Sequence, residues 1–424
     1  MKFRKVSALL LAGAMCAATV VGCGKTSSTS TTGSNDATKA AEDEEITATI
    51  TVWGPAEDQS VDNGEWLQNM CKKFNDEHPK WNLTFKYGTC SEGDAGKTVS
   101  ADPSASADVY MFANDQLQTL IDAGAISKLG GSALETVKKN NSEAMLSTVT
   151  IGDDVYGVPF TGNTWFLYYN KDIFTADDVK NLDTMLSKGK VSFKLTDSWY
   201  IGGFYIGNGC TVFGADGKDE KAGVDLTGDK ATDVTKYLVD LAANPNFVND
   251  ADQSGITGFN DGTIGAFFSG TWDKSNIKLD KSKVGVVAAP TYTLNGKENQ
   301  MTAFAGSKSI GVNPNCKYPQ VAVALALYLG SDEAQISHYE ARGIIPCNTG
   351  AVSNDKVAAD EMAVAQNDTM NNKSVMQPTC KAMSNWWTPA ENMGKSIIAG
   401  ETTKDNAADK TAEFNEGANN GVVK

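Results

Sequence analysis

The sequence predicts an α/β protein with two folded domains. Strand patterns alternate with amphipathic helix patterns along the chain, which is typical of helices packed on a mostly parallel sheet. About 380 of the 424 residues follow a polar N-terminal segment, and this length is too great for one compact core. Ligands of such sheets bind beyond the carboxyl ends of the strands, so a site is expected there.

Runs rich in β-branched and aromatic residues predict the strands. The first run alternates β-branched residues, and the third is short and apolar. A turn over 152–157, with its return strand, predicts a hairpin. The other expected strands cover residues 46–53, 81–87, 108–112, 165–170, 264–268, 284–288 and 309–312.

Apolar residues at helical spacing predict the helices. Trp66 and Phe74 share one face of the first helix. Asn114 and Asp197 are expected N-caps, and Gly124 is an expected αL stop. The expected helices cover residues 66–77, 114–123, 175–186, 196–207, 231–241, 320–329, 332–342, 358–366, 389–399 and 407–416.

Two adjacent tryptophans, Trp386 and Trp387, precede a helix-start signal. Thr388 and Glu391 have the spacing of a capping box, and Pro389 would occupy the first helical position. A helix starting there leaves both rings in the preceding loop, where they are free to face a cleft. In the alternative, one of the rings belongs to the buried face of a longer helix.

The N-terminal segment has the pattern of an export signal. Residues 1–5 are basic, residues 6–21 are small and apolar, and the ending at Cys23 resembles a bacterial lipobox. We expect a signal peptide over 1–22, a lipid on Cys23 and a flexible tether over 23–45. The expected location is the extracellular face of the cell membrane of a Gram-positive bacterium. A plain signal peptide followed by a free cysteine is the alternative.

The charge of the chain excludes several partners. Removing residues 1–22 removes three basic residues and no acid, which changes the formal net charge from −15 to −18. Such a surface repels nucleic acid and anionic lipid, so no nucleic-acid partner is expected. A neutral or cationic ligand suits it better.

Histidine and cysteine usage argues against a metal centre or a catalytic triad. The only histidines, His78 and His338, lie in predicted helices. The six cysteines beyond Cys23 show no CxxC spacing, so a zinc site is not expected. We expect no metal and no cofactor. Whether these cysteines pair is left open, and they are Cys71, Cys90, Cys210, Cys316, Cys347 and Cys380.

Several motifs together resemble one known family. They lie at residues 157–159, 169–174, 223–228, 237–241, 259–262, 270–277 and 284–290. In this order they resemble the extracellular solute-binding proteins (family 1) of carbohydrate ABC transporters, in particular the maltose- and maltodextrin-binding branch. The resemblance covers about residues 46–420. It implies a two-lobed, periplasmic-binding-protein-like (type II) α/β fold with a hinge and an interlobe cleft.

The resemblance also implies how the chain is divided. Residues 46–160 and 303–348 would form one lobe, and residues 165–298 and 352–424 the other. It further implies a monomer that captures an oligosaccharide, best maltose or maltooligosaccharides, and delivers it to an ABC transporter permease. No bond would be made or broken.

Sugar binding needs flat aromatic platforms and charged hydrogen-bond acceptors. The resemblance places platforms at Trp199, Trp272, Trp386 and Trp387, and carboxylates at Asp115 and Asp197. Asp115 and Asp197 have the alternative role of complementing a helix N-terminus.

The chain departs from the family pattern at several of these positions. A family tryptophan is Phe112 here, an arginine is Gln116, and a glutamate is Asn163. Glu57 and Asp58 replace an acid–base pair. The changed residues remain candidates for ligand binding. Trp165 has no aromatic counterpart in the family and is expected to fill the interlobe core, with an added platform for the ligand as the alternative.

Three other functions remain open from the sequence. The same cleft would suit another oligosaccharide or a non-sugar ligand, or an adhesin without a transporter. An exported glycoside hydrolase would need two carboxylates about 5–10 Å apart, and Asp115 and Asp197 are expected on different lobes. The neighbours Tyr168 and Tyr169 would point to opposite faces of a strand, which argues against an iron site.

Overall fold

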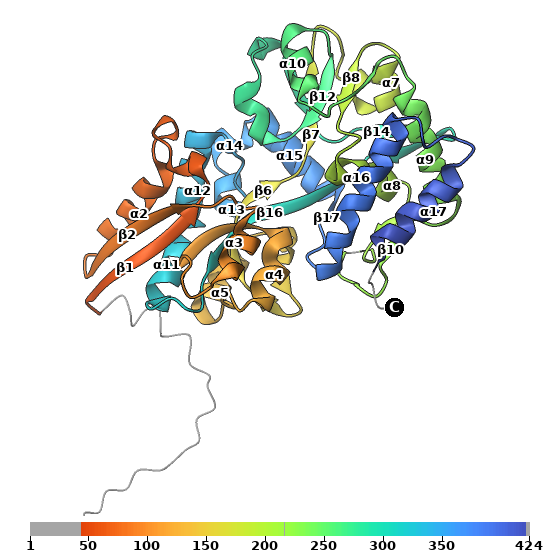
Figure 1. The fold of residues 1–424 in the computed structure, drawn as a ribbon. Coiled ribbons are helices and arrows are strands. Elements are labelled where there is room, and N and C mark those ends of the chain that lie inside the picture. Colours follow the sequence, from red (N-terminus) through yellow and green to blue (C-terminus); the bar gives the residue numbers. More distant parts are fainter. Residues whose placement is uncertain (1–43, 216, 421–424) are drawn as a thin grey trace, which may run out of the picture. The chain divides into compact units, whose positions relative to one another are not determined.

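The computed structural model describes residues 44–215 and 217–420. Cys23, the expected signal peptide and nearly all of the expected tether lie outside these residues. Two separate sheets form the two lobes of an α/β fold (Figure 1).

The first sheet is mixed and has six strands. β1 runs parallel to β2 and β3, whereas β16 runs antiparallel to β3 and to β6. The short β17 extends the sheet beside the start of β16. The strands are β1 (Ile46–Gly54), β2 (Trp81–Thr89), β3 (Val109–Ala113), β6 (Gly157–Asn163), β16 (Ala303–Val312) and β17 (Ser374–Met376).

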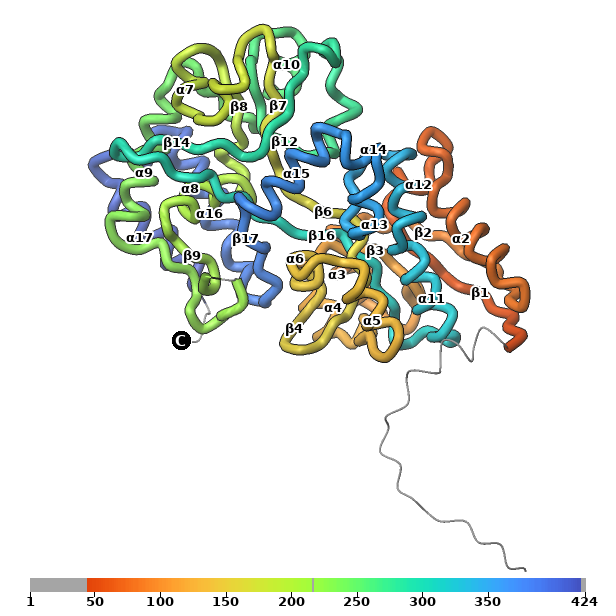
Figure 2. The backbone as a smooth tube through the Cα atoms, turned by 180° about the vertical axis from the view of Figure 1, so that it is seen from behind, coloured from red at the N-terminus to blue at the C-terminus, as the bar shows by residue number. Residues whose placement is uncertain are grey.

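Helices pack against this sheet and against one another (Figure 2). α2 contacts β2, α11 contacts β16, and α12 packs on α2. α3 contacts β3 and packs on α4, while α5 contacts α11. The bounds are α2 (Trp66–Asp76), α3 (Ala95–Ala101), α4 (Leu117–Asp122), α5 (Gly131–Asn140), α11 (Pro319–Leu329) and α12 (Asp332–Arg342).

The second sheet has β7 between two antiparallel neighbours, β12 and β13. Its order is β11 (Phe247–Asn249), β8 (Val191–Phe193), β12 (Ala266–Ser269), β7 (Phe166–Asn170) and β13 (Val284–Val287). β7 is buried on both faces: Tyr169 joins the larger core, and Tyr168 joins a smaller one on the opposite side. The expected opposite orientation of these tyrosines is confirmed.

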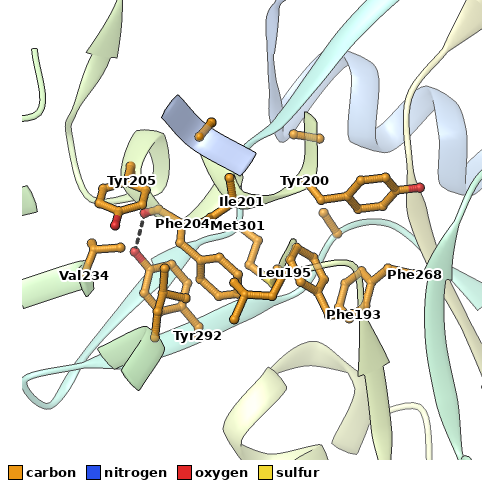
Figure 3. Packing of buried hydrophobic residues seen from close by; sticks show 14 of the residues in the cluster. Phe193, Leu195, Tyr200, Ile201, Phe204, Tyr205, Val234, Phe268, Tyr292 and Met301 are labelled. Carbon is orange, nitrogen blue, oxygen red and sulfur yellow. Dashed lines mark hydrogen bonds between the residues drawn. The ribbon is translucent and has the colours of Figure 1, made fainter. Parts of the chain in front are cut away.

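Aromatic side chains fill the larger core of the second lobe (Figure 3). Phe193 and Phe204 pack edge to face, with ring centroids 5.2 Å apart. The Tyr292 hydroxyl donates a hydrogen bond of 2.6 Å to the Phe204 carbonyl. The main helices of this lobe are α8 (Ser198–Gly207), α9 (Gly228–Ala242), α10 (Ser254–Asp261), α15 (Glu361–Asn372), α16 (Ser384–Ile398) and α17 (Ala407–Ala418).

β16 belongs to the cores of both lobes. Ala303 and Phe304 lie in the core of the second lobe, while Ile310 and Val312 lie in the core of the first. Burial of nine of its ten residues explains why the strand is almost entirely apolar or small. The expected strand over 309–312 is therefore only its second half.

Short elements complete the fold, and they include two departures from expectation. The helix expected over 175–186 is wrong, because only two short turns form there. β14 and β15 form a hairpin that the sequence analysis did not predict. Asn295 and Gly296 have the positive φ values of 52° and 77° that its tight turn requires. The short elements are η1 (Ala56–Gln59), η2 (Val61–Asn63), η3 (Asn114–Gln116), α6 (Glu143–Ser147), β4 (Thr150–Ile151), β5 (Asp154–Val155), η4 (Asp178–Lys180), α7 (Leu182–Leu186), β9 (Thr211–Val212), β10 (Val224–Asp225), η5 (Thr271–Asn276), η6 (Lys281–Lys283), β14 (Thr291–Leu294), β15 (Lys297–Gln300), α13 (Thr349–Val352), α14 (Asp355–Ala358) and η7 (Lys381–Met383).

The six cysteines that follow the N-terminal segment are all unpaired. Five are buried, and Cys380 is partly exposed. Burial raises the pKa of the Cys71 thiol to about 12, so this thiol stays protonated and behaves as a core residue. Within residues 44–215 and 217–420, no cluster of potential ligands for a metal ion is found, nor any helix long and apolar enough to span a bilayer.

Candidate functional site

The carboxyl ends of four strands bring polar side chains to one edge of the first sheet. β1, β2, β3 and β6 all end at this edge, and the antiparallel β16 begins there. Glu57 follows β1, Asp115 follows β3, and Asn163 ends β6. The structure therefore gathers three of the sequence-predicted residues at one edge, where ligands of open α/β sheets bind.

Asp115 is a partly buried carboxylate at this edge. Gln116 Nε2 donates a hydrogen bond of 3.0 Å to Asp115 Oδ2. Burial raises the pKa of Asp115 above its usual value, and the Gln116 bond and the charge of Lys308 partly oppose this rise. The carboxylate keeps free acceptor capacity for a ligand hydroxyl.

The Asn114 side chain bonds to β16 at this edge of the sheet. Asn114 does not cap a helix, so the expected N-cap is wrong. Its Oδ1 accepts a hydrogen bond of 3.1 Å from the Ser307 amide in β16. A side chain at Gly306 would collide with this amide group, so glycine allows the close approach. Gly306 pairs with the partly exposed Asn163 across the ladder.

Asp58 points into the first lobe, which corrects the expectation that it contacts ligand. Its side chain is 1% exposed. His338 Nε2 lies 2.9 Å from Asp58 Oδ1, and Arg342 also contacts this oxygen. Burial acts to raise the pKa of Asp58, but His338 and Arg342 together hold it below its usual value. The exposed Glu57 is the acid of this pair that stays available to a ligand.

Trp199 and Trp272 form an aromatic pair on the second lobe. Their ring centroids are 6.1 Å apart at an interplanar angle of 51°. Trp199 is partly exposed, and Trp272 retains 39% of its accessible surface. The Trp272 ring folds back over Gly270, where a Cβ atom would collide with it. Exposed aromatic faces of this kind suit the apolar C–H faces of sugars.

Asp197 begins α8 beside this pair. Its Oδ1 accepts a hydrogen bond of 2.8 Å from the Trp199 amide, so the expected N-cap is confirmed. The carboxylate is exposed and has an acceptor oxygen left.

Trp386 lies in the core, which corrects the expectation that its ring is a platform. α16 begins at Ser384, so both tryptophans are helical and the capping box at Thr388 is wrong. Trp386 is 0% exposed, packs at 90° against Phe304, and its Nε1 donates to the Ser198 carbonyl over 2.9 Å. Trp387, the next residue, is partly exposed. The alternative of a longer helix with one buried ring is confirmed.

Phe112 and Trp165 also fill cores. Phe112 is 0% exposed among the buried residues of the first lobe, which corrects its expected place at the ligand. Trp165 is equally buried and stacks on Tyr200, with ring centroids 5.6 Å apart, so its expected role in the core is confirmed.

A chain of hydrogen bonds connects the aromatic pair to the polar edge. Trp199 Nε1 donates a hydrogen bond of 2.9 Å to the side-chain oxygen Oε1 of Gln377. The backbone amide of Gln377 donates a hydrogen bond of 2.7 Å to the Ala305 carbonyl. The next residue, Gly306, lies against Asn114 and Asn163. The aromatic pair of one lobe and the amides of the other therefore converge on two residues of β16. Gln377 was missed from the sequence, since its contacts depend on the pairing of β17 with β16.

A second contact joins η5, the short helix that contains Trp272, to Tyr339 of the first lobe. Lys274 Nζ donates to Asp360 Oδ2 over 2.9 Å and lies 5.4 Å from the Tyr339 ring centroid. The Tyr339 hydroxyl donates to the same oxygen over 2.6 Å. Burial acts to raise the pKa of Asp360, but these two bonds hold it below its usual value. The cluster spans η5, α12 and the start of α15.

A cavity of about 560 Å³ lies between elements of the two lobes. α4 and the turn between β4 and β5 line one side. Gly217, Lys218, Glu220 and residues 379–381 line the other. The lining of this cavity is mostly polar.

The fold and these residues define a two-lobed solute-binding protein. Residues 69–365 match the family described as bacterial extracellular solute-binding protein, and the chain belongs to this family. Members of this family are extracellular solute-binding proteins rather than enzymes.

Individual relatives agree with this assignment. A solved structure with acarbose has 51% sequence identity and a TM-score of 0.84, and the match covers 89% of this chain and all of that one. The maltooligosaccharide ABC transporter solute-binding lipoprotein of Streptococcus pneumoniae is 28% identical over 82% of this chain and 85% of its own length. The maltodextrin-binding protein MalE1 of L. casei, solved without ligand, is 25% identical with a TM-score of 0.80, over 88% of this chain and 99% of that one.

The two kinds of tryptophan should respond differently to truncation. Trp386→Ala removes a fully buried ring and should lower the free energy of unfolding by about 3–5 kcal/mol. Trp272→Ala removes a partly exposed ring and should change it by less than about 1 kcal/mol. Urea denaturation of both variants measures the difference, and equal losses would contradict the core assignment of Trp386.

Asp58→Asn should destabilise the protein by about 3 kcal/mol at pH 7, because it leaves Arg342 and His338 without their buried anion. The folded-state pKa of Asp58 lies below the unfolded value of about 4. Its contribution is therefore complete above pH 4 and is lost as the pH falls through the folded-state pKa. Thermal melts of wild type and variant should converge in acid, and a constant difference down to low pH would refute this origin.

Proposed function

We propose that this protein binds an oligosaccharide between its lobes and delivers it to an ABC transporter permease. Maltose and maltooligosaccharides are the favoured ligands. A lipid on Cys23 would hold the protein at the extracellular face of the membrane, as a monomer. The protein would release its ligand unchanged, without making or breaking a bond. The solute named for the streptococcal relative supports this ligand class.

The convergence at Ala305 and Gly306 is the observation that carries the proposal. The aromatic pair is hydrogen-bonded through Gln377 to Ala305. The next residue, Gly306, pairs with Asn163 and lies against Asn114. Oligosaccharides need both features together, since one sugar ring presents an apolar face and a rim of hydroxyls.

The residues that we propose to contact the ligand have exposed or partly exposed side chains. They lie at the polar edge of the first sheet or near the aromatic pair of the second lobe. Aromatic faces would stack on sugar rings, and carboxylates and amides would bind hydroxyls. They are Trp199, Trp272, Trp387, Asp115, Asp197, Asn163 and Glu57.

The two lobes would close on the ligand by a hinge motion. We propose lobes of residues 46–160 with 303–348 and of residues 165–298 with 352–424, with β17 joining the first sheet at its edge. A ligand that touches both lobes stabilises the closed form through its higher affinity for that form. The closed lobes would then dock on the permease.

Ligand binding should be visible as increased stability. A maltooligosaccharide at a hundredfold its dissociation constant should add about 2.7 kcal/mol to the free energy of unfolding. Thermal shifts across maltose, maltotriose, maltopentaose and galactose-based oligosaccharides would measure this and rank the linkages. A panel in which no sugar raises the melting temperature, while an amino acid or metal ion does, would disprove the proposal.

The exposed tryptophans should dominate the affinity. Trp272→Ala and Trp199→Ala should each weaken maltotriose binding about 10- to 100-fold, as expected for aromatic anchors. Tyr87→Ala, which truncates a similarly exposed ring on β2, is the matched control and should bind as wild type does. Isothermal titration calorimetry measures all three. Unchanged affinity in both tryptophan variants would remove these rings from the site.

A further inference from the structure

Lys308 stands out within β16. The other nine residues of the strand are buried, whereas the Lys308 side chain retains 36% of its accessible surface. The register of β16 against β6 shifts between Lys308 and Ser309, and the extra residue of this irregularity is Phe160 in the neighbouring strand β6. Irregularities of this kind are frequent next to binding sites. Lys308 also pairs with Ala113, at the edge where Asp115 lies.

The Lys308 ammonium lies among acidic groups from two other strand ends. Its Nζ is 3.2 Å from Glu92 Oε2, in the segment after β2. Its charge also acts on the Asp115 carboxylate, after β3. The Glu92 side chain is only 13% exposed, and its backbone carbonyl accepts a hydrogen bond from the Ala113 amide. Glu92 therefore holds the ammonium on a fixed part of the sheet edge.

Neither the residue beside Asp115 nor Arg342 supplies a cation at this strand end. Residue 116, beside Asp115, is a neutral glutamine. Arg342, the one arginine beyond residue 22, is committed to the buried Asp58. The strand pairing of Lys308 with Ala113 places this cation at the strand end that Asp115 follows.

We propose that Lys308 is a specificity-determining residue that binds ligand together with Asp115. This inference rests on the proposed function and adds a residue to it. A carboxylate only accepts hydrogen bonds and an ammonium only donates them, so the pair matches two neighbouring hydroxyls of one sugar unit. Glu92 occupies one of the three ammonium N–H groups, which leaves two for the ligand.

The charge of this group also selects the ligand class. Glu92, Asp115 and Lys308 together carry one net negative charge when both carboxylates are ionised. Such a site favours neutral sugars over sugars that carry carboxylate or phosphate groups, because like charges repel at short range. The expected ligand is therefore a neutral oligosaccharide with a pair of adjacent free hydroxyls.

Calorimetry on variants of the full chain tests this inference. Lys308→Met should weaken maltotriose binding about 10- to 100-fold, the loss expected for a charge-assisted hydrogen bond. Lys97→Met is the matched control, because Lys97 is an exposed lysine of α3 on the same lobe, and it should bind as wild type does. Lys308→Arg keeps the charge and should recover part of the affinity.

Monodeoxy analogues of maltotriose distinguish contact from a structural role. At least one analogue should bind wild type about tenfold more weakly than maltotriose does, and the same analogue should lose little further affinity in Lys308→Met. Losses that are equal in wild type and variant would contradict direct contact. If Lys308→Met does not fold, judged by its melting curve, Lys308→Gln replaces it in the same comparison.

The outcomes separate this inference from the proposed function. If Lys308→Met binds maltotriose as tightly as wild type while Trp272→Ala does not, the role of Lys308 is wrong and sugar binding stands. If wild type binds no neutral oligosaccharide, the proposed function and the role of Lys308 are both wrong.

Discussion

The shared burial of β16 is the constraint on which both lobes depend. Phe304 is packed into one core and Ile310 into the other, so the strand cannot shift without disturbing both. Its hydrogen bonds to β3 and β6 fix the polar edge of the first sheet, and its pairing with β17 fixes Gln377. The two halves of the candidate site therefore take their positions from one element.

The proposed hinge motion has to be compatible with this rigidity. The small residues at 305–307 lie between the part of β16 packed into one core and the part packed into the other. The contacts of Tyr339 in α12 with Lys274 of η5 and with Asp360, the residue before α15, lie elsewhere and are polar. A polar contact of this type is better suited to breaking and reforming than an apolar one.

The sequence predicted the fold class and most helices, because helical periodicity and capping are local signals. Trp386 and Trp387 show the limit of such signals. Neighbouring helical residues point about 100° apart, so one ring of the pair is buried and the other is partly exposed, and only the packing against Phe304 decides which. Asp115 could be anticipated because it follows a strand end directly. The burial of Asp58 and the exposure of Lys308 could not, since they depend on α12 and on a register shift between distant strands.

The unpaired cysteines have a consequence for how the protein matures. No covalent cross-link joins any of the six thiols in the described part of the chain, and five of them are shielded from solvent. The native state is therefore reached without a disulfide-forming catalyst. The free energy of unfolding should be the same under reducing and oxidising conditions. Folding of this protein therefore does not require oxygen.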